Sequence, residues 1–165
     1  MTYFYSLILY SPKTNNDLSF ALPDVGLEVK EAGRVMNYGL LVGELLGVDT
    51  AKATELLMEV EHMTMFLADD DSETPKLLLD ADIAELLNVF LQTLAALKDA
   101  IDEQGFPIGP RGHTLASSAH MQRSEDGRLY IAGEYRDLLE LRSDIIHLCQ
   151  FFQFAIDHGF WLKIE

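Results

Sequence analysis

Residues 138–158 read LLELRSDIIHLCQFFQFAIDH, and this stretch decides the fold. Its apolar residues recur at three- and four-residue steps, the pattern of an amphipathic helix. They are Leu138, Leu141, Ile145, Leu148 and Phe152, with a second apolar side at Phe151 and Phe154. A helix that is apolar around most of its circumference is usually central to the fold. We therefore expect a central helix over about 134–158, ended by Gly159.

The segments that flank this helix are expected to form strands. Residues 160–164 predict a closing strand, and residues 119–132 predict a hairpin whose turn lies at 124–127. Residues 105–118, rich in glycine and proline, predict a loop before the hairpin. At the other end of the sequence, residues 3–10 are dense in Tyr, Phe, Leu and Ile and predict a further strand.

Three helices are expected between the first strand and the hairpin. The apolar spacing predicts helices over 27–46 and about 51–68, and a third that ends before Gly105. Asp82 and Glu85 resemble a capping box for the third helix. The spacing of Gly39 and Gly43 lets another element approach the first helix closely, for which tight internal packing is the plainest explanation.

These elements predict a single α+β domain over residues 1–165. We expect a small, mostly antiparallel sheet of about four strands, including both terminal ones, packed against about four helices. The one cysteine, Cys149, excludes an internal disulfide and is expected to be buried and inert. No signal peptide or membrane span is recognised in the sequence, so we expect a cytoplasmic protein.

Charge is distributed unevenly along the chain. The formal net charge is −15, and residues 1–104 hold 19 Asp and Glu against 6 Lys and Arg. Residues 105–165 hold 8 against 6. Such an excess repels nucleic acid and anionic lipid, so neither is an expected partner, and it attracts basic molecules.

The densest run of carboxylates covers the second and third expected helices and the acidic connection between them. Ten lie within residues 55–85, opposed there by Lys76 alone. We expect this acidic surface to bind a partner. Its members are Glu55, Glu59, Glu61, Asp69, Asp70, Asp71, Glu73, Asp80, Asp82 and Glu85.

Motifs for catalysis, cofactors and metals are not recognised. The pairs Glu59 with His62 and Asp144 with His147 have a spacing used in di-metal sites, but the first lies off the apolar face of its helix. The acidic run that begins at Asp69 lacks the glycine that a calcium loop needs at its sixth position. We therefore predict no cofactor or metal, and an enzyme is only an alternative.

An alternative ligand site is formed by the 105–118 loop, the hairpin and the last helix. Arg111 and His113 could bind an anion, and His147 and Phe151 belong to an aromatic stripe at helical spacing. The simpler interpretations are an ordered loop and a second core face of the helix. If the site exists, these side chains converge on one concave pocket.

The sequence thus favours a cytoplasmic binding protein whose acidic face docks on a basic protein. This physical profile resembles that of bacterial immunity proteins, which block toxins, although no motif in the chain carries the likeness. A toxin domain is accordingly one partner of the expected kind. The alternatives are a small ligand-binding protein or enzyme, and a homodimeric structural or adaptor protein that uses its terminal strands or its glycine-bearing helix.

Overall fold

The strands nearest the two ends of the sequence pair with each other. A computed structural model describes residues 5–14, 16–17, 28–59, 77–133 and 136–165. Strand β1 (Leu7–Ser11) runs antiparallel to β8 (Trp161–Ile164), with Leu7 opposite Ile164. β4 (Leu77–Leu78) pairs with β8, and β2 (Asn16–Asp17) and β3 (Glu28–Val29) pair with β1. The sheet therefore has the order β2-β1-β8-β4, with β3 beside β1.

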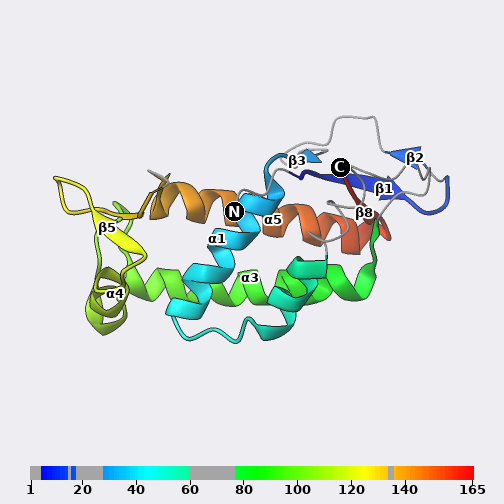
Figure 1. Cartoon of the computed structure of the whole chain (residues 1–165). Coiled ribbons are helices and arrows are strands. Elements are labelled where there is room, and N and C mark those ends of the chain that lie inside the picture. Colours follow the sequence, from blue (N-terminus) through cyan, green and yellow to red (C-terminus); the bar gives the residue numbers. More distant parts are fainter. Residues whose placement is uncertain (1–4, 15, 18–27, 60–76, 134–135) are drawn as a thin grey trace.

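Three long helices form the body of the molecule. They are α1 (Ala32–Leu45), α3 (Asp80–Ala100) and α5 (Leu138–His158). α3 and α5 run in opposite directions, and α1 crosses both (Figure 1). Phe90 of α3 and Phe151 and Phe152 of α5 are fully buried. The expectation that the last helix is central to the fold is confirmed, as is its end at Gly159, whose φ of 66° suits glycine.

Two glycines allow α1 to approach its neighbours. A Cβ atom on Gly39 would lie 2.8 Å from the Phe90 ring, and one on Gly43 would lie 2.6 Å from Thr93 Oγ1. Only a residue without a side chain fits at such distances. The internal packing expected for this glycine pair is confirmed, and the same face of α1 is therefore not free to form a dimer interface.

A second, separate sheet lies at the opposite end of the helices from β1 and β8 (Figure 1). It consists of β5 (Met121–Arg123), β6 (Leu129–Ile131) and β7 (Arg136–Asp137), all antiparallel. The predicted hairpin and its turn at 124–127 are confirmed. The α+β class is confirmed too, but the strands are more numerous than the four expected and are divided between two sheets.

The expected loop at 105–118 is wrong, because it contains α4 (Gly109–Ala116). Pro110 stands in the first turn, where its missing N–H and fixed φ suit a helix. Gly112 lies so close to the Ala100 carbonyl that a Cβ there would be 2.4 Å from the oxygen. Pro110 thus belongs to the start of a helix and Gly112 to a close packing contact, although both residues suggested a loop.

Two helix starts also differ from the expectation. Residues 28–29 pair with β1 instead of beginning the first helix, so that helix starts at Ala32. The third helix starts at Asp80, which makes Asp82 its third residue. The Asp82 carboxylate accepts a hydrogen bond of 3.3 Å from the N–H of Leu79, the N-cap residue. Asp82 therefore occupies the third helical position of a capping-box contact and not the N-cap position that the sequence predicted.

Residues 51–59 form a further helix, as expected. The remainder of the predicted helix to residue 68, the acidic connection at 69–75 and the start of the first strand at 3–4 lie outside the described residues. Within the described part of the chain, no helix is both long and apolar enough to cross a membrane.

The crossing at Gly43 can be tested by a double-mutant cycle. Gly43→Ala is expected to lower the free energy of unfolding by about 1–3 kcal/mol, because the clash with Thr93 Oγ1 outweighs the better helix propensity of alanine. Thr93→Ala removes the clashing atom, so the double variant should lose at least about 1 kcal/mol less than the sum of the single variants. Urea denaturation measures all three. Strict additivity would contradict the described contact.

Cys149 gives a second test of the packing. Burial raises the pKa of its thiol from 9.0 to about 12. The native protein should therefore not react with a thiol reagent at pH 8, and should react once unfolded. Because the unfolded thiol ionises first, the free energy of unfolding should fall more steeply between pH 9 and 12 than it does in Cys149→Ala. Rapid labelling of the native protein would contradict the burial.

Candidate functional site

The expected acidic surface is described in part. Glu55 and Glu59 lie one turn apart on the helix at 51–59, and both are exposed. Asp80, Asp82 and Glu85 lie in the first two turns of α3, where Asp80 is exposed and the other two are half-buried. Figure 1 draws the 51–59 helix in front of the N-terminal half of α3. The other five members lie outside the described residues: Glu61, Asp69, Asp70, Asp71 and Glu73.

The described members of this surface have no cationic partner. Among the described residues, no Lys or Arg side chain lies within 4 Å of Glu55, Glu59, Asp80 or Glu85. Asp82 and Asp80 have a local function as well, since acidic groups in a first turn complement the helix dipole. Glu55 and Glu59 have no such function in the fold, which makes them the informative pair.

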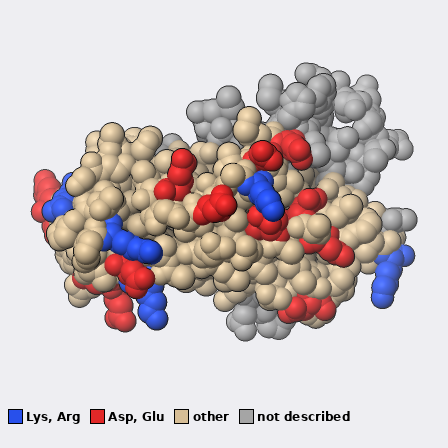
Figure 2. Space-filling model, turned by 90° about the horizontal axis from the view of Figure 1, so that it is seen from below, with Lys and Arg blue, Asp and Glu red and all other residues tan. Residues whose placement is uncertain are grey.

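Figure 2 shows the molecule from below the view of Figure 1. Its Asp and Glu side chains form several groups that are separated by uncharged residues, with Lys or Arg beside some of them. The described residues of this face thus carry distributed negative charge and not one uninterrupted patch. The fields of such groups add where they lie within a Debye length of each other, ~8 Å at physiological salt.

The residues of the alternative site occupy different places in the fold. Arg111 and His113 are exposed on α4, which packs on α3 and β5. Phe151 is fully buried in the core, as the simpler interpretation of the aromatic stripe predicted. Phe154, the next member of that stripe, stacks on His158 at a ring distance of 4.0 Å.

His147 lines a polar pocket of about 290 Å³ between the start of α1 and the first half of α5. The ion pair between Arg136 and Asp144, 2.5 Å long, lies at its wall. Lys30 and Glu31 of the turn before α1 complete the charged lining. Besides the imidazole, the described part of this lining holds one ion pair and one further charge of each sign, so its charges favour neither a cationic nor an anionic ligand.

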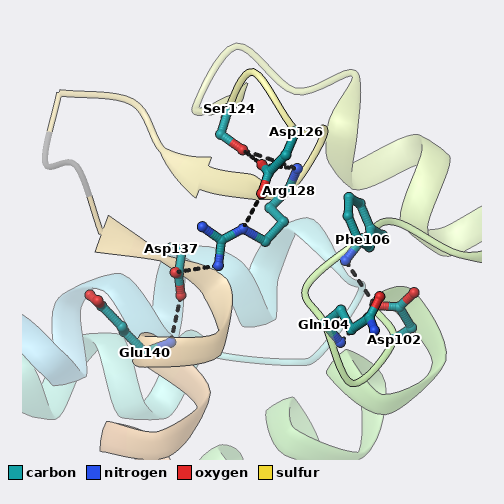
Figure 3. A network of polar contacts seen from close by, with 8 residues as sticks. All are labelled: Asp102, Gln104, Phe106, Ser124, Asp126, Arg128, Asp137 and Glu140. Atoms are coloured by element: carbon teal, nitrogen blue, oxygen red, sulfur yellow. Dashed lines mark hydrogen bonds and ion pairs between the residues drawn. The ribbon is translucent and has the colours of Figure 1, made fainter.

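A polar network joins the hairpin to the first turn of α5 (Figure 3). The Arg128 guanidinium lies 3.0 Å from Asp126 and 3.7 Å from Asp137. The Ser124 hydroxyl donates to the Asp126 carboxylate, and this bond, with the backbone and guanidinium of Arg128, lowers the pKa of Asp126. Asp137 also accepts a 2.8 Å bond from the Glu140 N–H and so caps α5.

This network accounts for a pocket of about 270 Å³ that Ser124, Arg128, Tyr130 and Asp137 line. The charged groups in it are paired with each other, so it is best understood as a structural link between β6 and α5. In the described part of the chain, no three His, Cys, Asp or Glu side chains lie together as metal ligands would.

The sequence did not predict a third pocket, of about 520 Å³, which lies between α3, the segment 101–108 that follows it, and α5. Its apolar lining comes from Leu94, Ile101, Ile108 and Ile146, and its cations are Lys98 and Arg142. The pairs Leu94 with Lys98 and Arg142 with Ile146 are each one helical turn apart. That spacing is a visible signal, but the partner helices cannot be matched from the sequence alone.

The capping function of Asp137 predicts a difference between two substitutions. Asp137→Ala removes both the cap and the contact with Arg128, and should lower the free energy of unfolding by roughly 1–2 kcal/mol. Asp137→Asn retains an oxygen that accepts from Glu140 and should cost less than about 0.5 kcal/mol, since the lost ion pair is partly exposed. Urea denaturation distinguishes them. Equal losses would show that the ion pair matters more than the cap.

Comparison with known proteins gives no match, whether to a family model, a curated protein or a solved structure. The charges, pockets and contacts described above are therefore the basis on which a function is assigned to this chain.

Proposed function

We propose that this chain is a cytoplasmic binding protein that docks its acidic surface on a basic protein. The observation that carries the proposal is the pair of exposed carboxylates Glu55 and Glu59, which lie one turn apart on one helix. Near the hairpin, arginines neutralise two carboxylates, in the pairs of Arg128 with Asp126 and Arg136 with Asp144. On the helix at 51–59, Glu55 and Glu59 have no such partner among the described residues.

Two unpaired carboxylates one turn apart, Glu55 and Glu59, fit a cationic partner better than they fit a stabilising role. Like charges spread over neighbouring helices repel each other and reduce the stability of the fold slightly. A basic protein relieves that repulsion on binding, and the long-range field accelerates its approach. Inhibition of a basic toxin domain is one function of this kind.

Met58 supplies an apolar contact within the same surface. Its side chain is 64% exposed and lies between Glu55 and Glu59 in the sequence of one helix. Exposed methionine adapts its shape to different partners, and apolar anchors surrounded by charges are common in interfaces. The proposed interface therefore combines electrostatic attraction with a flexible apolar centre.

The variant Glu55→Lys/Glu59→Lys tests this proposal. In a pull-down from lysate of the source cells, the wild-type chain should retain a basic protein at about 50 mM salt and release it near 0.5 M, since salt screens exposed charges. The double reversal should retain at least tenfold less. The matched control, Asp99→Lys/Glu125→Lys, changes the net charge equally at exposed positions elsewhere and should bind as wild type does.

Circular dichroism of each variant establishes that it is folded. Equal retention by the reversal and by the wild type would contradict docking through Glu55 and Glu59. Loss of binding in both double variants would mean that only net charge matters. Reversal of Asp69, Asp70, Asp71 and Glu73 to lysine extends the same test to the acidic connection.

A further inference from the structure

We propose that the pocket between α3, the segment 101–108 and α5 binds a small apolar molecule that carries a carboxylate. The pocket has a volume of about 520 Å³. This volume lies in the range of roughly 300–1,000 Å³ that is usual for sites of small organic ligands, and the pocket is open to solvent on one side. This site lies apart from the acidic surface, so it goes beyond the proposed docking function.

The apolar part of the ligand would contact side chains that the fold leaves open to solvent. Ile108, just before α4, is 39% exposed, and Ile146 of α5 is 41% exposed. Leu94 of α3 is half-buried beside them, and Ile101 forms the buried floor. Covering these groups removes apolar surface from water, which favours binding.

The sign of the ligand's charge follows from the two cations of the lining. Lys98 and Arg142 have no carboxylate within 4 Å among the described residues, although the chain as a whole has a net charge of −15. Arg142 is half-buried, and a guanidinium that is partly removed from water gains most from an anionic partner. A carboxylate fits its two parallel donors.

The two carboxylates of the lining do not fill this need. Asp102 accepts hydrogen bonds of 2.9 Å and 3.0 Å from the backbone N–H groups of Gln104 and Phe106, so its charge is directed into that turn. Glu103 is exposed and has no contact with either cation within ion-pair distance. Asp102 is held by these backbone bonds, so the lining charges without a polar partner among the described residues are Lys98, Arg142 and Glu103. Two of the three are positive, and Arg142 alone among them is partly buried.

Decanoate and decan-1-ol are suitable probes, because they share an apolar chain and differ in charge. Isothermal titration should detect decanoate binding to the full chain, and decan-1-ol should bind roughly tenfold more weakly, as expected for a lost charge-assisted hydrogen bond. Arg142→Gln should weaken decanoate about tenfold and leave decan-1-ol unchanged. The control Arg123→Gln removes an exposed arginine on β5 and should change neither.

Ile146→Glu provides a second variant, since it places an anion in the pocket at a position exposed enough to tolerate it. It should abolish decanoate binding while the thermal unfolding midpoint remains near that of the wild type. The proposal is overturned if decanoate does not bind, if the alcohol binds equally well, or if Arg142→Gln binds as wild type does. It is also overturned if sedimentation shows a dimer that Ile146→Glu dissociates and decanoate does not affect.

Discussion

The close contact of α1 with α3 and α5 is the constraint on which the rest of the fold depends. Gly39 meets Phe90 and Ile145, and Gly43 meets Thr93, at distances that admit no side chain on α1. Because packed interiors do not absorb even one extra methyl group freely, these contacts fix the position of α1 over the other two helices. Through the turn before Ala32, the same contacts position β3 against β1, and hence one edge of the larger sheet.

The sequence predicted the elements whose signal is local and missed those that depend on distant partners. Apolar spacing in α5 and the turn at 124–127 are local patterns, and both were predicted correctly. By contrast, Glu28 and Val29 belong to a strand only because β1 lies beside them. The error at α4 has another cause, because proline and glycine usually interrupt a helix. Here Pro110 lies in the first turn, where a helix tolerates it, and Gly112 lets α4 pack closely against the Ala100 carbonyl.

The candidate sites show the same difference between what local sequence reveals and what depends on distant parts of the chain. An excess of carboxylates is visible in any sequence, so Glu55 and Glu59 could be named before the structure was known. Whether a carboxylate has a cationic partner is decided in three dimensions, as the pairing of Arg136 with Asp144 illustrates. The pocket that holds Lys98 and Arg142 could not be predicted, because α3, α5 and the segment 101–108 form it together. Each of the two helices contributes a pattern that resembles an ordinary amphipathic face.

The place of β8 in the larger sheet has a consequence for biosynthesis. Among the described strands, β1 and β4 are joined through β8 alone, so the two parts of this sheet stay separate on the ribosome until residues 161–164 have been translated. At about 5–20 residues per second, the interval after β1 emerges lasts many seconds. During it, Leu7 and Leu9 lack the strand that finally covers their edge. A nascent chain that stalls before residue 161 would therefore present an open strand edge to chaperones and to other nascent chains.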